Sequence, residues 1–261
     1  MPEVKKHPQG EPCWVELATS DEKGALKFYS GLFGWKDDAR PMGPGMFYHM
    51  QQLKGQNAAA LYQIGPNDPP GTPPHWGVYF AVNSADDTAK KIKAAGGKVV
   101  MEPLDVFDAG RWVVAQDPSG AFVRFWQAKN HIGHSVANEP GAFTWAELLS
   151  RGVKKALPFY KSVLGIEIAA ALMPGVEYHL FKLNGTDVAG AMEMPKEVPA
   201  VVPSNWTPYF AVANADASVT KAKALGGKVI QPAQDIPNVG RFATIADPQG
   251  AVFSILQPVA R

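Results

Sequence analysis

The sequence has few of the features that mark secreted, membrane-spanning or nucleic-acid-binding proteins. Its 261 residues include a single cysteine, Cys13, which excludes an internal disulfide. No run of 18 apolar residues occurs, and the polar N-terminal stretch lacks the apolar region of a signal peptide. Basic residues total 25 against 24 acidic ones, without a long basic run, which argues against nucleic-acid and membrane-surface partners. We therefore expect a soluble cytoplasmic protein.

What the sequence does contain is a long internal repeat. Residues 14–34 match residues 145–165 at a constant offset of 145 − 14 = 131, and later segments match at an offset of 130. The later matches pair residues 75–82 with 205–212, 96–99 with 226–229, 110–111 with 240–241, and 117–121 with 247–251. A repeat of this length predicts a duplicated domain.

The repeat divides the chain into two domains of ordinary size. We expect one domain over residues 12–127, a polar linker over 128–141 and a second domain over 142–258. Alternating strand patterns and helix signals give the order β-α-β-β-β twice in each half.

The first helix illustrates these local signals. Thr19 and Glu22 fit a capping box at its start, and Gly34 fits its end. Apolar residues at 25, 28, 29 and 32 have helical spacing, so we expect the Phe28-Tyr29 pair, like its repeat Phe159-Tyr160, to lie in the core.

Four stretches of the first half carry a family resemblance: ATSDEKGALKFYSGLFGW, HWGVYFAV, GGKVV and DPSGAFVRFWQ. With their repeats, they resemble the vicinal oxygen chelate superfamily of glyoxalase I, bleomycin-resistance proteins and extradiol dioxygenases. The fit is closest to a duplicated two-domain subgroup of glyoxalase-like antigens or hydroxylases. The resemblance implies an α+β fold of tandem glyoxalase-like domains, in which four βαβββ modules form two curved-sheet cups with the helices outside.

Metal-dependent members of that superfamily hold a cation with His, Gln or Glu at four strand positions of a cup. Carrying these positions over gives Trp14, Ala60, Gly77 and Arg124 in the first half, and Trp145, Gly190, Thr207 and Ser254 in the second. None is a preferred ligand of a divalent cation, and an arginine would repel one. We therefore predict neither metal nor cofactor.

Two other metal sites remain open as hypotheses. Glu16, His49 and His75 could form a non-standard site in the first cup. His131-x-x-His134 with Glu139 also has ligand-like spacing, but these residues lie in the linker, for which we favour a solvated loop.

Strand alternation assigns side chains to the cups. The predicted ligand-binding residues are Trp14, Glu16, His49, His75, Tyr79, Arg124 and Trp126 in the first cup, and Trp145, Glu147, Asn205 and Tyr209 in the second. Aromatic walls with a few converging polar groups are typical of a small-molecule pocket.

The polar residues of the first cup admit several roles. Arg124 either contacts a ligand or neutralises Glu16. Glu16, His75 and Tyr79 are weak candidates for acid–base catalysis. Elsewhere, Arg111 and Arg241 follow acidic segments and are expected to pin loops through Arg–Asp pairs.

The sequence favours metal-independent binding or transformation of a planar or aromatic small molecule. One alternative is a metal-dependent lyase or dioxygenase of the same superfamily, and another is a non-catalytic interaction protein; whether the protein is an enzyme stays open. We expect a small-molecule partner, without nucleic acid or membrane, and either a monomer with an internal pseudo-dimer or a homodimer.

Overall fold

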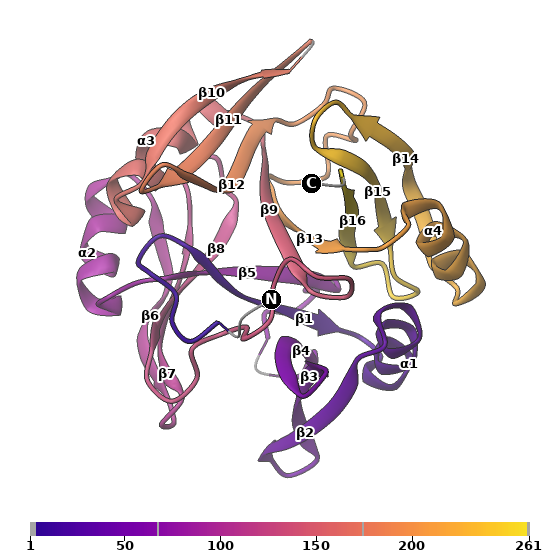
Figure 1. The fold of residues 1–261 in the computed structure, drawn as a ribbon. Helices are drawn as coiled ribbons and strands as arrows, with labels where there is room; N and C mark the ends of the chain where they lie inside the picture. The colour runs from indigo at the N-terminus through magenta and orange to yellow at the C-terminus, as the bar shows by residue number, and fades with distance from the viewer. Residues whose placement is uncertain (1–3, 67, 174, 260–261) are drawn as a thin grey trace.

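The computed structural model describes residues 4–66, 68–173 and 175–259. Within those residues the chain forms two 8-stranded sheets, one from each half, and four helices (Figure 1). Both sheets have the same strand order, as the repeat predicts. The two halves therefore form an internal pseudo-dimer with the expected α+β architecture.

The first sheet has the order β2-β3-β4-β1-β5-β8-β7-β6. Its strands are β1 (Pro12–Thr19), β2 (Lys36–Gly43), β3 (Met46–Leu53), β4 (Gln56–Gln63), β5 (His75–Ala81), β6 (Lys98–Val106), β7 (Gly110–Gln116) and β8 (Phe122–Ala128). The central strand β1 pairs parallel with β4 and antiparallel with β5, so two βαβββ modules meet side by side in one sheet.

The second sheet repeats this arrangement in the order β10-β11-β12-β9-β13-β16-β15-β14. Its strands are β9 (Phe143–Ser150), β10 (Glu167–Met173), β11 (Val176–Leu183), β12 (Thr186–Glu193), β13 (Asn205–Ala211), β14 (Lys228–Ile236), β15 (Gly240–Ala246) and β16 (Val252–Pro258). Here β9 is the central strand, paired parallel with β12 and antiparallel with β13.

The helices are α1 (Glu22–Phe33), α2 (Ala85–Ala94), α3 (Val153–Leu164) and α4 (Ala215–Ala224). Helix α1 begins one residue after its cap, Asp21, whose side chain accepts a hydrogen bond from the Gly24 amide. The capping box expected from Thr19 is therefore wrong: the Thr19 hydroxyl lies beside the backbone of Asp21 instead. Gly34 ends the helix with φ 77°, a backbone conformation that favours glycine.

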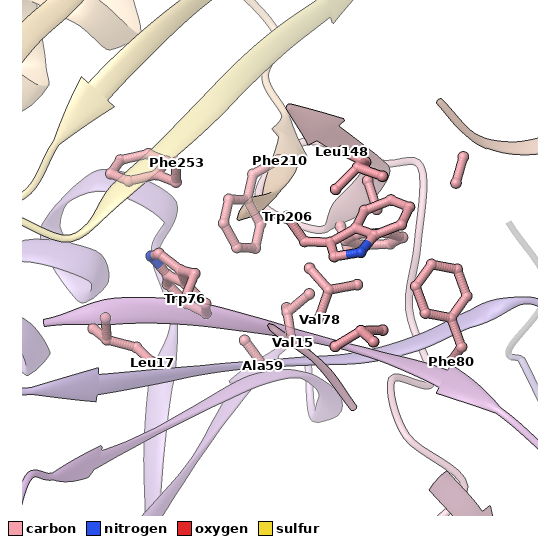
Figure 2. Packing of buried hydrophobic residues seen from close by; sticks show 14 of the residues in the cluster. Val15, Leu17, Ala59, Trp76, Val78, Phe80, Leu148, Trp206, Phe210 and Phe253 are labelled. Atoms are coloured by element: carbon pink, nitrogen blue, oxygen red, sulfur yellow. The ribbon is translucent and has the colours of Figure 1, made fainter. Parts of the chain in front are cut away.

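The helices lie between the two sheets, which curve away from each other (Figure 1). Helix α1 contacts α4, α2 contacts α3, and the central strands β5 and β13 touch across the interface. One continuous core fills this space, with Trp76, Phe80, Trp206 and Phe210 at its centre (Figure 2). Each sheet thus presents one face to the shared core and turns its other face outward.

Two tyrosines link the halves inside this core. The Tyr29 hydroxyl donates to Asp247 at 3.0 Å and accepts from the Trp76 indole at 3.0 Å. The Tyr160 hydroxyl makes the matching bonds to Asp117 and from Trp206, both at 2.8 Å. The prediction that the Phe-Tyr pairs are core residues is confirmed, because all four are at most 1% exposed.

The linker over 128–141 is packed, so the expectation of a solvated loop is wrong. The His134 amide bonds to the Cys13 carbonyl at 2.8 Å, and the Ser135 amide bonds to Asn57 at 2.8 Å. His134 is only 3% exposed, and its ring lies 4.4 Å from that of His7. The segment lacks helical spacing and instead ties the N-terminal arm to the first sheet.

None of the helices in the described ranges has the length and apolar character that a bilayer crossing requires. Cys13 is fully buried, and burial raises the pKa of its thiol well above the ordinary value. A thiol in that state is a poor nucleophile, in line with a packing role.

Candidate ligand sites on the outer faces of the two sheets

The sheet faces that point away from the shared core carry the candidate sites. We call these faces the first cup (β1–β8) and the second cup (β9–β16). Strand alternation separates the two faces: Val15 and Leu17 of β1 enter the shared core, whereas Trp14 and Glu16 lie in the first cup.

A chain of hydrogen bonds ends on Glu16 in the first cup. The Trp14 indole donates to the Tyr48 hydroxyl at 2.9 Å, and that hydroxyl donates to the Glu16 carboxylate at 2.9 Å. Tyr79 donates to the other carboxylate oxygen at 2.6 Å. The register explains the convergence, because Trp14 lies opposite Tyr79 on the paired strands.

Arg124 neutralises this carboxylate. Its Nε lies 3.7 Å from Glu16 Oε1, and its guanidinium carbon lies 5.6 Å from the centre of the Tyr79 ring. Gly77 provides the room: a Cβ at that position would come within 1.9 Å of Arg124 Nη1. The sequence left open whether Arg124 contacts a ligand or neutralises Glu16, and this geometry favours the internal pair.

His75 completes the polar group of the first cup. Its Nε2 lies 3.1 Å from Arg124 Nη2 and its Nδ1 lies 2.9 Å from the Pro73 carbonyl. Burial, and then the nearby guanidinium, lower the pKa of His75, so the ring is neutral at pH 7. Glu16, His75 and Tyr79 therefore come together as a group, but Arg124 lies among them.

The second cup repeats the same hydrogen bonds. The Trp145 indole donates to the Tyr178 hydroxyl at 3.0 Å, and Tyr209 donates to the Glu147 carboxylate at 2.7 Å. Tyr178 also bonds to Glu147. Four residues of the first cup thus have identical counterparts with matching contacts.

The second cup differs in its charge. Ser254 stands where Arg124 stands in the first half, and Thr207 stands where Gly77 stands. Among the residues that the structure describes, no lysine, arginine or histidine forms an ion pair with Glu147. Burial raises the pKa of the Glu147 carboxyl above its ordinary value, although the bonds from Tyr209 and Tyr178 act in the opposite direction.

The two cups also differ in how completely side chains fill them. In the first cup Trp14, Tyr79 and Trp126 are 3%, 4% and 6% exposed and form a separate buried cluster with Met50. Trp145 and Glu147 are only half-buried, and no matching buried cluster forms within the described part of the second cup. Smaller residues account for the difference, since Leu256, Phe242 and Met192 replace Trp126, Trp112 and Tyr62.

The linker closes the end of the first cup. The ring of His131 lies 4.6 Å from the Trp14 ring, and its carbonyl accepts a hydrogen bond from the Trp126 indole at 2.8 Å. Desolvation lowers the pKa of His131 to about 4, so an uncharged ring packs against the two indoles. The disfavoured hypothesis of a metal site at His131, His134 and Glu139 is not supported, because Glu139 pairs with Lys54 and no group of three metal ligands occurs among the described residues.

The donor set of neither cup fits a divalent cation. Glu16, not Trp14 as expected, is level with Ala60 and Gly77 across the paired strands, and Glu147 is level with Gly190 and Thr207. Each cup therefore offers one carboxylate at these positions. No group of three His, Cys, Asp or Glu side chains suited to a metal occurs in residues 4–66, 68–173 and 175–259. Zinc sites in proteins use three or four such ligands.

One predicted cup residue lies on the wrong face. The Nε2 atom of His49 lies 3.4 Å from Glu22 of α1, and its Nδ1 lies 2.8 Å from Asp37 of β2. Its neighbour Tyr48 takes the place in the cup that was expected for His49. The Tyr-His pair recurs in both halves, so repetition alone could not distinguish the two; only the pairing of β3 with β4 fixes which one faces Glu16.

The other predicted residues of the second cup lie near Glu147. Asn205 accepts a hydrogen bond from the Thr207 hydroxyl at 3.0 Å, at the position equivalent to His75. Trp145 and Tyr209 provide ring faces beside the carboxylate, and Phe242 lies 6.3 Å from the Tyr209 ring. Apolar ring faces around one polar group suit an organic ligand.

Two hollows lie outside both cups. One of about 560 Å³ is an open depression over α3 and β10, lined by Lys154, Leu157, Pro158, Lys161, Ile168 and Glu177. The other, of about 190 Å³, lies between the N-terminal arm and the end of β8. Neither contains Glu16 or Glu147.

Comparison with known families gives one model that matches both halves. The model described as Glyoxalase/Bleomycin resistance protein/Dioxygenase superfamily matches residues 13–125 and 142–255. The protein named "Putative glyoxylase CFP32" of Mycobacterium tuberculosis is 45% identical over 264 aligned positions, covering 99% of this chain and 98% of its own length. Anthracycline biosynthesis protein DnrV of Streptomyces peucetius is 37% identical over 259 positions, covering 95% and 93%.

Solved structures share the fold at low sequence identity. The Mn(II)-bound glyoxalase from Novosphingobium aromaticivorans superposes with a TM-score of 0.67 at 15% identity, covering 97% of this chain and 83% of that one. The 2,3-dioxygenase LapB from Pseudomonas sp. KL28 gives a TM-score of 0.64 at 13% identity, covering 98% and 93%. At these identities the likeness concerns the fold alone.

Proposed function

Because this chain belongs to the Glyoxalase/Bleomycin resistance protein/Dioxygenase superfamily, we propose that it binds a planar aromatic small molecule in its second cup without a metal ion. The observation that carries the proposal is that the Trp145 ring and the Glu147 carboxylate lie side by side on one sheet face and are both only half-buried. Within the described residues, the second cup lacks the buried aromatic cluster that covers the equivalent groups in the first cup. Ring faces stack on planar ligands, and a single polar group fixes their orientation.

The contrast with the first cup supports the choice of the second. In the first cup Arg124 pairs with Glu16, and His131 covers Trp14 and Trp126. Those contacts satisfy the groups that a ligand would otherwise meet. We therefore propose that the closed first cup stabilises the protein without binding a ligand. For that half, the alternative of a non-catalytic interaction protein stays open.

The names of relatives agree with an aromatic ligand. Two Streptomyces proteins that are 37% and 36% identical to this chain are named for anthracycline biosynthesis. Anthracyclines are built on fused planar rings, which could stack on the half-buried ring of Trp145. These names concern the relatives and guide the choice of a probe.

The proposal is tested by titrating the protein with alizarin, a planar hydroxyanthraquinone, while following tryptophan fluorescence. We expect saturable quenching with one equivalent bound per chain. Trp145→Leu should weaken binding about tenfold, since stacking on an aromatic ring contributes roughly 1 kcal/mol beyond buried area. Absence of saturable binding to alizarin and to a panel of fused-ring compounds would contradict the proposal.

Trp14→Leu is the matched control, because Trp14 holds the equivalent position in the first cup and makes the same bond to a tyrosine. It should leave alizarin affinity unchanged once folding has been checked by thermal unfolding. Metal analysis of the purified protein addresses the metal-dependent lyase or dioxygenase. A stoichiometric transition metal, with binding lost on chelation, would favour that alternative.

A further inference from the structure

The two cups share a set of four equivalent residues but differ in charge as well as in filling. Trp14, Glu16, Tyr48 and Tyr79 have the same types of residue and the same contacts as their counterparts in the second half. Only the first cup also holds a guanidinium, that of Arg124. The first cup can therefore be read as the shared receptor with its cation in place, and the second as the same receptor without it.

The position of the guanidinium shows what the receptor recognises. Arg124 lies beside the Glu16 carboxylate and 5.6 Å from the centre of the Tyr79 ring. A carboxylate supplies charge and hydrogen-bond acceptors, and a tyrosine ring attracts a cation through its electron-rich face. In the second cup Glu147 and Tyr209 hold the same arrangement, joined by a hydrogen bond of 2.7 Å.

From this comparison we propose that the second cup binds an organic cation of the amidinium or guanidinium type, with its charged group beside Glu147 and Tyr209. The inference rests on the proposed function, because it names the chemical class of the ligand for the same site. The flat charged group lies beside Glu147 but is displaced from the place of Arg124, because the Thr207 side chain fills part of the space that Gly77 leaves open in the first cup. The body of the ligand packs against the half-buried Trp145 ring.

The side chains of the second cup leave the carboxylate free for such a ligand. Ser254 replaces the arginine, and its hydroxyl bonds to Thr244 at 2.9 Å instead of to Glu147. Thr207 adds a small side chain where Gly77 admits the guanidinium, and its hydroxyl bonds to Asn205. The Glu147 carboxylate is half-buried and, unlike Glu16, forms no ion pair with a lysine, arginine or histidine among the described residues.

Calorimetric titration with benzamidine tests the inference, with benzamide as the neutral compound of nearly the same shape. We expect one benzamidine to bind per chain. We expect benzamide to bind at least about tenfold more weakly than benzamidine. Glu147→Gln, which keeps the shape of the side chain, should weaken benzamidine binding about tenfold, the usual effect of losing a hydrogen bond to a charged group. The same substitution should leave benzamide binding unchanged.

A transplant of the first cup supplies a second test. The double variant Thr207→Gly/Ser254→Arg rebuilds the Gly77 and Arg124 pair in the second half and should abolish benzamidine binding. Thr207→Gly alone is its control and should retain binding, since it only enlarges the site. Thermal unfolding checks that each variant is folded. If the double variant does not fold, the titration of Glu147→Gln still tests the inference.

Three outcomes overturn the inference. If benzamide binds as tightly as benzamidine, or if Glu147→Gln leaves benzamidine affinity unchanged, the site does not select a cation. If alizarin binds but benzamidine does not, the cation is again excluded while the proposed aromatic ligand stands. If neither alizarin nor benzamidine binds, the inference and the proposed function both fail.

Discussion

Glu16 and Glu147 occupy equivalent places in two copies of one sheet, yet their surroundings differ. Each accepts a hydrogen bond from the equivalent tyrosine, Tyr79 or Tyr209, but Glu16 also faces Arg124, whereas a serine stands at the position of that arginine in the second half. The first carboxylate belongs to a closed, internally neutralised cluster, and the second is half-buried and unpaired by any described cation. Under the proposed function, duplication lets one copy stabilise the fold while the other offers its acidic group to a ligand.

Removing the guanidinium tests this comparison with the largest expected effect. Arg124→Leu should lower the free energy of unfolding by about 3 kcal/mol, because it leaves the Glu16 carboxylate buried without its cation. Urea denaturation measures the loss. The double variant Glu16→Gln/Arg124→Leu should recover much of it, since no buried charge then remains; if the double variant is as unstable as the single one, Arg124 contributes through packing and not through charge.

The shared core offers a pair of substitutions that should behave alike in the two halves. Tyr29→Phe and Tyr160→Phe each remove a hydroxyl that joins a buried indole to an aspartate of the opposite half. Each should cost about 1–3 kcal/mol, because the indole and the carboxylate lose a buried partner. Urea denaturation of both variants should give similar losses. A large effect in one half alone would mean that the cores, like the cups, have diverged.

Replacing the unpaired carboxylate should have a smaller effect of the opposite sign. Folding raises the pKa of the Glu147 carboxyl above its ordinary value of 4.5. The protonated carboxyl therefore stabilises the folded protein fully at a pH below 4.5, and this stabilisation is lost as the pH rises through the pKa of the folded state. Glu147→Gln should therefore raise the melting temperature at pH 7, and the difference from the wild type should shrink as the pH falls to 4. Melting curves between pH 4 and 8 measure this.

Glu16→Gln is the matched control for that pH series. It leaves the Arg124 guanidinium buried beside a neutral amide, so it should lower the melting temperature at pH 7 where Glu147→Gln raises it. Equal shifts of the same sign in the two variants would show that the charge difference between the cups does not matter.

Much of the architecture could be predicted because the repeat constrains it twice. Two copies of one pattern fix the module order, and alternation along β1 and β5 assigns Trp14, Glu16 and Tyr79 to one face. The same alternation places Arg124 in the first cup, where pairing with Glu16 was one of the two roles that the sequence left open. These features depend on local periodicity, which the sequence carries directly.

The remaining features depend on how strands align with one another. The register of β1 against β5 places Glu16 and not Trp14 opposite Gly77, and the residues of β1 alone do not fix that register. The face of His49 depends on the register of β3, which alternation cannot decide when both neighbours are polar aromatic residues. The closure of the first cup by His131 is a contact between the linker and two strands, β1 and β8, and no local pattern encodes it.

The smallest effect is expected at the surface, where the halves again match. Arg111 donates to Asp86 through two nitrogens, at 3.0 and 2.9 Å, and Arg241 makes the equivalent bonds to Asp216 at 2.9 and 3.0 Å. The predicted pairs with the preceding acidic segments are confirmed by Arg111–Asp105 at 3.1 Å and Arg241–Asp235 at 3.2 Å, whereas the bonds to Asp86 and Asp216 were not predicted. Each arginine lowers the pKa of its aspartate, so the stabilisation is present at neutral pH and is lost as the pH falls below the ordinary value of 3.8.

Arg111→Gln and Arg241→Gln should accordingly lower the melting temperature slightly and to the same extent in low salt. The effect should disappear in about 1 M salt, where charges on the surface are screened within roughly 3 Å. Differential scanning calorimetry at two salt concentrations measures both points. These pairs are exposed in both copies, so both variants should respond to salt alike. If the fall in melting temperature persists in high salt for only one of the two variants, the halves have also diverged outside the cups, although their contacts match.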